Sequence, residues 1–266
     1  MTARQDSTTA PAAIDKWWWP AGAYRADHPS VFFFSGAGVD QAWAANPLIP
    51  LVKGFNFGVW RMPGRATRIN EPAPVDMPAL ADEIARSIVA IKAVRPVLCG
   101  HSYGGLVAFM GSTALERLGH SAGRFVPVAA ACPREWQLGG LYTRFRGGPA
   151  KYAAYRLERA AERGELPPEL AGATEDMVLR RNLVTDFALG LSVTKLPTLR
   201  STPTTDISTS TDEQLLIKSP TRWKRHTKAE FDSIVTTGSH LFYQDRPDIA
   251  INVLQNESRI AFDGDF

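Results

Sequence analysis

A serine between two glycines is the residue whose surroundings most clearly predict chemistry. Ser102 stands in the middle of Gly100–Gly104, a pentapeptide with the spacing Gly-x-Ser-x-Gly. A serine hydroxyl is a weak nucleophile at neutral pH, so it needs a base within hydrogen-bond reach. The flanking glycines permit the sharp strand-to-helix turn that exposes such a serine. We therefore predict that Ser102 attacks a carbonyl group, rather than forming only a structural turn.

The base is expected to be a histidine late in the chain, because the triad order in this class of fold is serine, acid, histidine. The five histidines are His28, His101, His120, His226 and His240. The first two precede Ser102, the third lies at the end of a predicted helix, and we expect His226 to be solvated in a charged helical stretch. His240 follows a predicted strand and a turn at 236–239, so we predict that it is the base.

The acid of the triad is harder to assign from the pattern. The carboxylates considered between the predicted lid and His240 are Asp206, Asp212, Glu213 and Asp232. Asp206 follows a possible strand, whereas Asp212 lies in a loop rich in serine and threonine, just before a helix that we predict from Glu213 onward. Capping of that helix would explain Asp212 without a catalytic role. The residue pattern alone leaves Asp206 and Asp212 as equal alternatives.

Attack on a carbonyl places negative charge on its oxygen, and two backbone N–H groups are expected to stabilise it. Tyr103, the residue after the nucleophile, supplies one donor, and the loop after an early strand supplies the other. Residues 35–38, Ser-Gly-Ala-Gly, form the loop that fits, with Ala37 as the favoured donor. We expect Ala37 and Tyr103 to form the oxyanion hole. The alternative is a glycine turn with no role in binding.

Short apolar segments alternate with amphipathic ones around these residues. We predict strands at 31–34, 55–60, 97–99 and 125–131, and helices at 76–94 and 106–118. Continuous apolar runs are typical of strands covered on both faces. The alternation of strands and helices predicts a mostly parallel sheet with helices on both faces. Together with a serine at a strand-to-helix turn, this predicts an α/β class protein with an α/β-hydrolase fold.

The pattern changes in the second half of the chain. Residues 134–195 are polar and helix-prone, with the best helices at 151–163 and 175–187. A helical block between strands predicts a lid over the active site. Further elements are predicted at 198–207 (weak strand), 231–235 (strand) and 247–255 (helix). We expect one α/β-hydrolase domain over 28–266, with the lid at about 134–195.

Residues 1–27 are predicted to be an N-terminal extension. Its first part is rich in Ser, Thr, Ala and Pro, which is typical of a loose tail. Three adjacent indoles at Trp17–Trp19 cannot all face one core. We expect this segment to lie across the domain with two rings buried, and the alternative is a docking patch for a partner.

Charge, cysteine content and hydrophobicity indicate which binding partners and which cellular location to expect. The formal charge of +3 is spread along the chain, so it neither requires nucleic acid nor excludes an acidic protein partner. Cys99 and Cys132 lie in small apolar runs, which predicts buried free thiols. No stretch reaches the roughly 20 apolar residues of a membrane span, and no signal peptide is visible. We therefore expect a cytoplasmic protein that binds neither membrane nor nucleic acid, and needs no metal or organic cofactor.

Several motifs follow one another in a recognisable order. They are Phe34–Val39 (Phe-Ser-Gly-Ala-Gly-Val), Met62–Arg65 (Met-Pro-Gly-Arg) with Glu71 and Pro72, Gly100–Gly105 (Gly-His-Ser-Tyr-Gly-Gly), Val184–Phe187 (Val-Thr-Asp-Phe) and Gly238–Phe242 (Gly-Ser-His-Leu-Phe). Over about residues 17–255 the chain thereby resembles the stand-alone type II thioesterases of polyketide and non-ribosomal peptide biosynthesis. Ser35, Val39 and Tyr103 depart from the motifs of that family, so the substrate range stays open.

The resemblance implies a substrate and an acid. The substrate would be an acyl group held as a thioester on the phosphopantetheine arm of an acyl or peptidyl carrier protein, and hydrolysis through an acyl-Ser102 intermediate would serve editing or release. The family's acid lies about nine residues after a proline and about eleven before a tryptophan; counted from Pro203 and Trp223, both spacings give Asp212. The expected triad is therefore Ser102, Asp212 and His240.

Other functions remain open at this point. The acyl-enzyme could be intercepted by an alcohol or amine, which would make the protein an acyltransferase or cyclase, or the chain could be a non-catalytic partner of a synthase. Carrier proteins are usually acidic, so a basic docking face is expected near the site. The candidates in the predicted lid are Arg144, Arg146, Lys151 and Arg156. An ordinary solvated helix face is the alternative.

Overall fold

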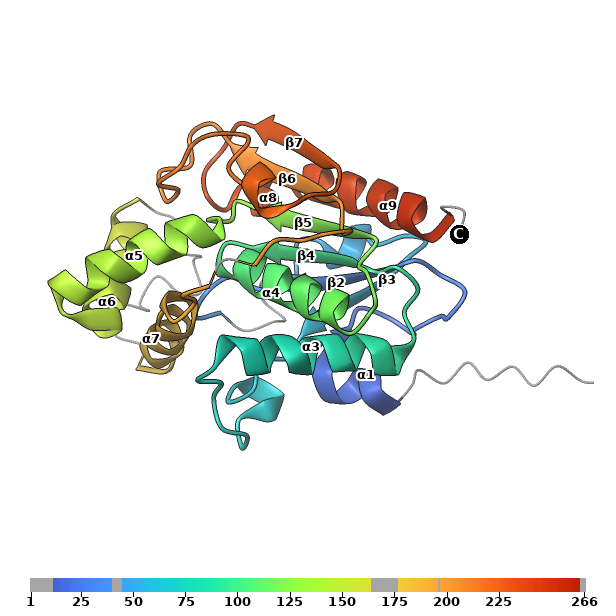
Figure 1. Ribbon diagram of the computed structural model, residues 1–266, viewed down its shortest axis with the longest axis horizontal. Helices are drawn as coiled ribbons and strands as arrows, with labels where there is room; N and C mark the ends of the chain where they lie inside the picture. Colours follow the sequence, from blue (N-terminus) through green and yellow to red (C-terminus); the bar gives the residue numbers. More distant parts are fainter. Residues whose placement is uncertain (1–11, 40–44, 164–176, 196, 264–266) are drawn as a thin grey trace, which may run out of the picture.

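A twisted sheet forms the centre of the molecule (Figure 1). The computed structural model describes residues 12–39, 45–163, 177–195 and 197–263. The strands are β1 (Trp18–Pro20), β2 (Ser30–Phe34), β3 (Asn56–Trp60), β4 (Val97–His101), β5 (Arg124–Val128), β6 (Thr204–Thr209) and β7 (Phe231–Thr236). Their order is β1-β3-β2-β4-β5-β6-β7, and every neighbouring pair is parallel except β1 with β3. The predicted α/β-hydrolase fold with a mostly parallel sheet is confirmed.

Helices cover both faces of this sheet (Figure 1). They are α1 (Ala12–Trp17), α3 (Met77–Ile91), α4 (Tyr103–Arg117), α5 (Pro133–Arg146), α6 (Gly148–Glu162), α7 (Met177–Leu191), α8 (Phe242–Asp245) and α9 (Pro247–Asp263). Side chains alternate along a strand. Phe32 and Phe34 of β2 therefore join the core beneath α3 and α4, whereas Val31 and Phe33 join the core beneath α9. This two-sided burial explains the unbroken apolar runs.

The helices that flank the serine begin at identifiable positions. The Asp76 carboxylate accepts a hydrogen bond from the Ala79 N–H at 2.9 Å, so Asp76 caps the N-terminus of α3. Helix α4 begins at Tyr103, three residues earlier than expected. Ser102 is consequently the single residue between β4 and α4.

The helices α5, α6 and α7 lie together at one end of the sheet, between β5 and β6 in the chain (Figure 1). Two of them, α6 and α7, correspond to the helices predicted at 151–163 and 175–187, while the third extends the block toward β5. Residues 164–176, which include the first two residues of the second predicted helix, lie outside the described residues. The position of the three helices is that expected of a lid, and we use that word for α5–α7.

The tryptophan segment is part of the sheet. Trp18 pairs with Trp60 as β1 joins β3 and forms the edge of the sheet, and its indole is fully buried next to Phe32 and Phe34. Trp17 and Trp19 are only half-buried, so one ring rather than two is fully covered. The Trp17 Nε1–H donates to Glu83 at 3.0 Å. The segment from residue 12 is thereby anchored to the domain, and residues 1–11 lie outside the described part.

Two local expectations are wrong. No helix begins at Glu213, because the backbone N–H groups of Leu216 and Ile217 donate to the carboxylate of Glu135 on α5 (2.8 and 2.9 Å) instead of to a helical carbonyl. His226 is buried rather than solvated, since its ring packs against Phe109 and Trp223. Burial lowers the pKa of His226 to about 4.

Other expectations agree with the structure. Cys99 and Cys132 are buried free thiols, and burial raises the pKa of both above the usual value. The weak strand expected at 198–207 exists but begins only at Thr204. None of the helices in the described ranges is long and apolar enough to cross a membrane.

Candidate active site

The predicted nucleophile lies on a strained turn at the carboxyl end of β4. Ser102 has φ 55° and ψ −120°, a conformation that residues with a Cβ rarely adopt. Its N–H donates to the Val128 carbonyl on β5 at 3.0 Å. A Cβ on Gly100 would lie 2.1 Å from the Gly104 carbonyl oxygen, and one on Gly104 would lie 2.0 Å from that of Phe34. Only glycine fits at both positions, and the turn places Ser102 at the edge of a pocket.

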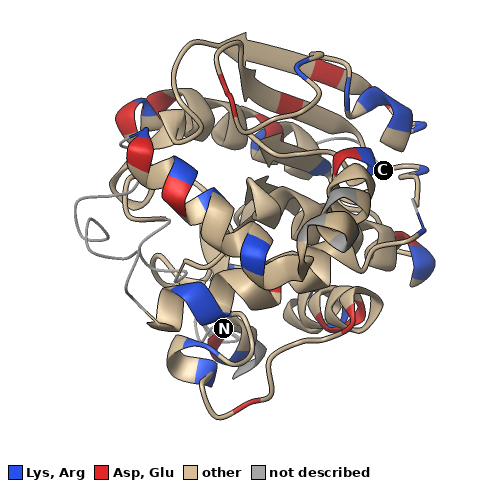
Figure 2. Ribbon diagram, turned by 90° about the vertical axis from the view of Figure 1, so that its left-hand side faces the viewer, with Lys and Arg blue, Asp and Glu red and all other residues tan. Residues whose placement is uncertain are grey.

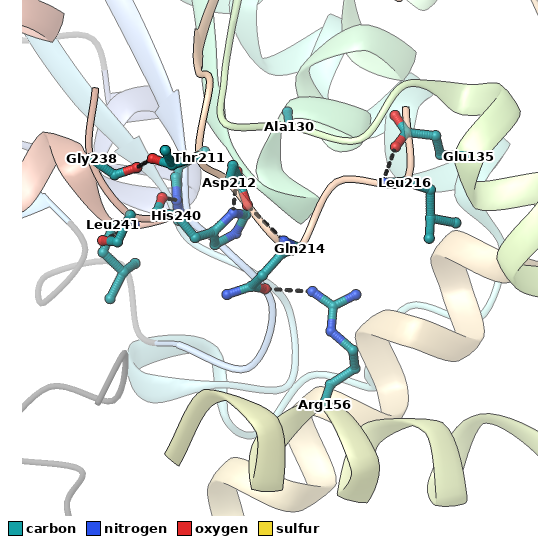
Figure 3. Close-up of polar contacts among 12 residues, drawn as sticks. Ala130, Glu135, Arg156, Thr211, Asp212, Gln214, Leu216, Gly238, His240 and Leu241 are labelled. Atoms are coloured by element: carbon teal, nitrogen blue, oxygen red, sulfur yellow. Dashed lines mark hydrogen bonds and ion pairs between the residues drawn. The ribbon is translucent and has the colours of Figure 1, made fainter. Parts of the chain in front are cut away.

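His240 and Asp212 form a buried pair (Figure 3). The distance from His240 Nδ1 to Asp212 Oδ2 is 2.8 Å, and the Gln214 N–H donates to Asp212 Oδ1, also at 2.8 Å. Burial acts to raise the pKa of Asp212, but these hydrogen bonds outweigh it, so its pKa lies below the usual value. Ionised Asp212 therefore accepts a hydrogen bond from the protonated Nδ1 of His240. The unprotonated Nε2 of His240 can then act as a base.

Asp206, the other candidate acid, belongs to a different cluster. It is fully buried on β6, where Oδ1 pairs with the Arg222 guanidinium at 2.9 Å. Burial raises the pKa of Asp206 to about 7, against the lowering effect of Arg222. Arg222 also donates to the Ala130 carbonyl, so this pair ties the 222–223 segment to the end of β5. Of the two alternatives, the structure brings Asp212 and not Asp206 to His240.

A second histidine, His101, contacts the backbone of His240. His101, the residue before the nucleophile, points its Nε2 at the His240 carbonyl oxygen, 3.0 Å away. Burial, together with the charge that His240 carries when protonated, lowers the pKa of His101 to about 3. His101 is therefore neutral near pH 7 and donates from Nε2. The sequence prediction missed this contact, although the position beside Ser102 was a signal for it.

The expected oxyanion residues come together around Ser102. Ala37, Tyr103, Ser102 and His240 all line the same pocket. Ala37 lies in the loop after β2, and Tyr103 is the first residue of α4. A Cβ on Gly36 would lie 3.1 Å from His101 Nδ1, so this loop passes tightly over the strand that carries the nucleophile.

A buried ion pair holds the oxyanion loop to the lid. Asp186 of α7 accepts a hydrogen bond from the Gly38 N–H at 2.7 Å and pairs with Arg65, and both charged side chains are almost completely buried. Leu183, one turn earlier, packs against Gly38 so closely that a Cβ there would lie 2.6 Å from Leu183 Cγ. The residues before Gly38 in this loop include Ala37. Arg65 and Asp186 belong to two of the motifs described above, Met62–Arg65 and Val184–Phe187, but their contact was not predicted from the sequence.

The pocket at Ser102 is mainly apolar and enclosed by the lid. The cavity volume is about 150 Å³. The lid contributes Trp136, Leu157, Ala160, Leu179, Leu183 and Phe187 to its walls. Two long polar side chains, Arg156 and Gln214, also line it. Such a cavity suits an acyl chain whose carbonyl carbon lies at Ser102.

The charges on the lid do not gather as a single basic face. Figure 2, which views the molecule from the lid end, shows basic and acidic residues side by side along these helices. Arg159 and Glu162 of α6 form an ion pair at 2.7 Å. Lys151 is exposed, Arg156 lines the pocket, and the side chains of Arg144 and Arg146 lie outside the described set. Within the described ranges, no group of three or more His, Cys, Asp or Glu side chains is arranged to hold a metal ion.

Comparison with known proteins gives one family and one curated relative. Residues 51–256 match the model of the thioesterase domain. A Streptomyces griseus protein named as a probable cadicidin biosynthesis thioesterase is 27% identical over an alignment of 252 residues that covers 90% of this chain. The chain spans 65% of the length of that relative.

Solved structures of similar fold include two with a TM-score of 0.74. The type II thioesterase BorB from the borrelidin biosynthetic cluster is 18% identical, with 91% of this chain and 97% of that one aligned. YbtT, the type II thioesterase from the yersiniabactin pathway, is 20% identical, with 92% and 99% aligned. RedJ from the prodiginine pathway of Streptomyces coelicolor follows with a TM-score of 0.69, 21% identity, and 86% and 90% aligned. At these identities the likeness concerns the fold.

Proposed function

The chain belongs to the thioesterase family, and we propose that it hydrolyses acyl groups from the phosphopantetheine thioesters of acyl or peptidyl carrier proteins in polyketide or non-ribosomal peptide biosynthesis. The observation that carries this proposal is the pocket that contains Ser102, His240 and the two expected oxyanion donors, with Asp212 behind His240. The relatives described above support the biosynthetic setting. We propose that the reaction takes place in the cytoplasm, in line with the expectation from the sequence.

The first half of the reaction forms an acyl-enzyme. Nε2 of His240 accepts the proton of the Ser102 hydroxyl as its oxygen attacks the thioester carbon. The carbonyl oxygen takes up the electron pair and is stabilised by the N–H groups of Ala37 and Tyr103. When the C–S bond breaks, the thiol of the carrier leaves with the proton from His240. Ser102 then carries the acyl group as an ester.

The second half releases the acid. His240 accepts a proton from a water molecule, whose oxygen attacks the ester carbon, and then returns the proton to Ser102 as the C–O bond breaks. Asp212 accepts the Nδ1–H of His240 throughout and balances the charge of the imidazolium. Each proton and electron pair in this scheme is handled by side chains, backbone amides and water, so no metal or organic cofactor enters it.

The test compares wild type with Ser102→Ala on a hexanoyl group loaded on a phosphopantetheinylated carrier protein. We expect wild type to release hexanoic acid, and Ser102→Ala to lose at least about 10³-fold in kcat. A serine-directed fluorophosphonate should label Ser102 of wild type, as located by mass spectrometry. Equal turnover by the two proteins would refute the assignment of Ser102, and release of a hexanoyl ester or amide in place of the free acid would indicate acyl transfer.

A further inference from the structure

One arginine enters the apolar pocket from the lid. Arg156 belongs to α6, is half-buried, and lines the cavity together with Ser102 and His240. Its guanidinium lies 5.8 Å from the ring centroid of Tyr152 and 5.9 Å from that of Phe187. The hydrolysis scheme above makes no use of this charge.

The hydrogen-bond partners of Arg156 are neutral. Nη1 donates to the Tyr152 hydroxyl at 3.0 Å, and Nη2 donates to Oε1 of Gln214 (Figure 3). Arg156 forms no ion pair with any carboxylate of the described residues. The four buried arginines differ from it, because each pairs with at least one carboxylate: Arg65, Arg68, Arg124 and Arg222. A guanidinium has five N–H donors, so donors of Arg156 remain for an anion, and its charge is not balanced by a carboxylate of the described residues.

The position of Arg156 indicates which anion fits. Gln214 accepts from Arg156 with its side chain and donates to Asp212 with its backbone N–H, and Asp212 contacts His240. Three consecutive contacts thus join the guanidinium to the base of the triad, as Figure 3 shows. An anion bound at Arg156 would therefore lie in the same cavity as Ser102 and His240. The phosphate of the carrier's arm is separated from the thioester sulfur by the whole pantetheine unit, whereas a carboxylate at the end of a short acyl chain is not.

We propose that Arg156 forms an anion subsite in the acyl pocket, which selects thioesters whose acyl group ends in a carboxylate. This rests on the proposed thioesterase function and names the class of acyl group. The terminal carboxylate binds the free N–H groups of Arg156, while the thioester carbon lies at Ser102. The aromatic rings of Tyr152 and Phe187 flank the guanidinium and fix its plane.

The test uses two thioesters of N-acetylcysteamine, adipyl and hexanoyl, which have the same number of carbons and differ in the terminal carboxylate. We expect Arg156→Met to lower kcat/KM for the adipyl thioester about 10- to 100-fold, as for loss of a hydrogen-bonded charge, and to change that for the hexanoyl thioester less than about twofold. Arg156→Lys should restore part of the loss. Arg159→Met, on the solvent side of the same helix, is the control and should change neither value.

Two results would overturn the subsite. An equal loss on both thioesters in Arg156→Met would mean that Arg156 only supports Gln214 and the acid loop. A loss that appears with hexanoyl-phosphopantetheine but not with hexanoyl-pantetheine, while adipyl turnover is unchanged, would assign the charge to the phosphate. If wild type hydrolyses no thioester, the proposed function fails separately from the subsite.

The subsite is then tested by calorimetry with an analogue of adipyl-pantetheine in which an NH group replaces the thioester sulfur. Binding of this analogue should weaken in Arg156→Met and stay as in wild type in Arg159→Met.

Discussion

Two walls of the pocket are connected to the lid in different ways. The oxyanion wall consists of the loop Gly36–Gly38 with Arg65, and α7 reaches it through Asp186, whose carboxylate is almost completely buried. The acid wall consists of Asp212 and Gln214, and α6 reaches it through Arg156, which is half-buried and bonded to neutral groups. The connection from α7 is a buried ion pair, whereas the connection from α6 is a half-exposed hydrogen bond next to the cavity.

The difference matches what each wall has to do. Oxyanion donors stabilise charge only when they are held in a fixed position before the reaction, so a buried tie at Gly38 is useful there. Breaking a buried ion pair is costly, whereas a half-exposed hydrogen bond exchanges with water at little cost. We therefore expect α7 to belong to the rigid scaffold of the site, and α6 to be the part of the lid that adapts to the acyl group.

The largest effect is expected on the acid wall, in Asp212→Asn. The amide can still accept from the Gln214 N–H, but its NH₂ group would face Nδ1 of His240 and favour the wrong tautomer. We expect kcat to fall by about 10³- to 10⁴-fold. The free energy of unfolding should change by less than about 1 kcal/mol, because packing and one hydrogen bond persist. The measurements are thioester hydrolysis and urea denaturation.

Asp206→Asn is the matched control for that prediction. It leaves the buried charge of Arg222 without a carboxylate partner, so the free energy of unfolding should fall by about 3 kcal/mol. Turnover per folded molecule, counted by fluorophosphonate labelling, should stay within about threefold of wild type, since Asp206 does not contact His240. The opposite outcome, with Asp206→Asn inactive and Asp212→Asn active, would reverse the assignment of the acid.

On the oxyanion wall, Asp186→Asn should reduce both stability and rate. Arg65 loses its only carboxylate partner among the described residues, so the free energy of unfolding should fall by about 3–5 kcal/mol. The Gly38 N–H keeps a weaker acceptor, and we expect kcat to fall about tenfold through a less fixed loop, with KM nearly unchanged.

A double variant separates the two effects. Arg65→Met with Asp186→Leu removes both charges and should regain most of the stability, as buried ion pairs replaced by apolar side chains often do. It also removes the acceptor of the Gly38 N–H, so kcat should remain low. Recovery of kcat together with stability would show that Asp186 serves the fold alone, and α7 would then not belong to the oxyanion wall.

The sequence predicted the parts of the site that depend on local geometry. The turn at Ser102 and the position of His240 after β7 follow from short patterns of glycine and apolar residues. The acid could not be settled from the residues themselves, because the answer depends on where β6 ends: Asp206 lies within that strand and Asp212 beyond it. Here the family resemblance favoured the residue that the structure brings to His240.

Contacts between segments that are far apart in the sequence could not be predicted from local residue patterns. Arg65 and Asp186 are 121 positions apart, and nothing in the spacing of either residue marks the other as its partner. The helix expected from Glu213 fails for the same kind of reason, since Glu135 on α5 takes the N–H groups that a helix would need. His226 has charged neighbours in the chain but aromatic neighbours in space. Local charge was therefore a poor guide to burial.

The smallest effect is expected at Tyr103, beside the oxyanion wall. This residue lines both the main pocket and a small cavity beside Arg65 and Asp186. Its hydroxyl is buried and has no hydrogen-bond partner among the described residues, and burial raises the pKa of the phenol well above its usual value. The proposed role of Tyr103 uses only its backbone N–H.

Tyr103→Phe should therefore leave kcat within about twofold and raise the free energy of unfolding by about 0–1 kcal/mol, because an unpaired buried polar group is removed without a change of shape. Hydrolysis of the hexanoyl carrier thioester and urea denaturation are the measurements. A loss of tenfold or more in kcat would mean that the hydroxyl itself reaches the substrate or the oxyanion loop.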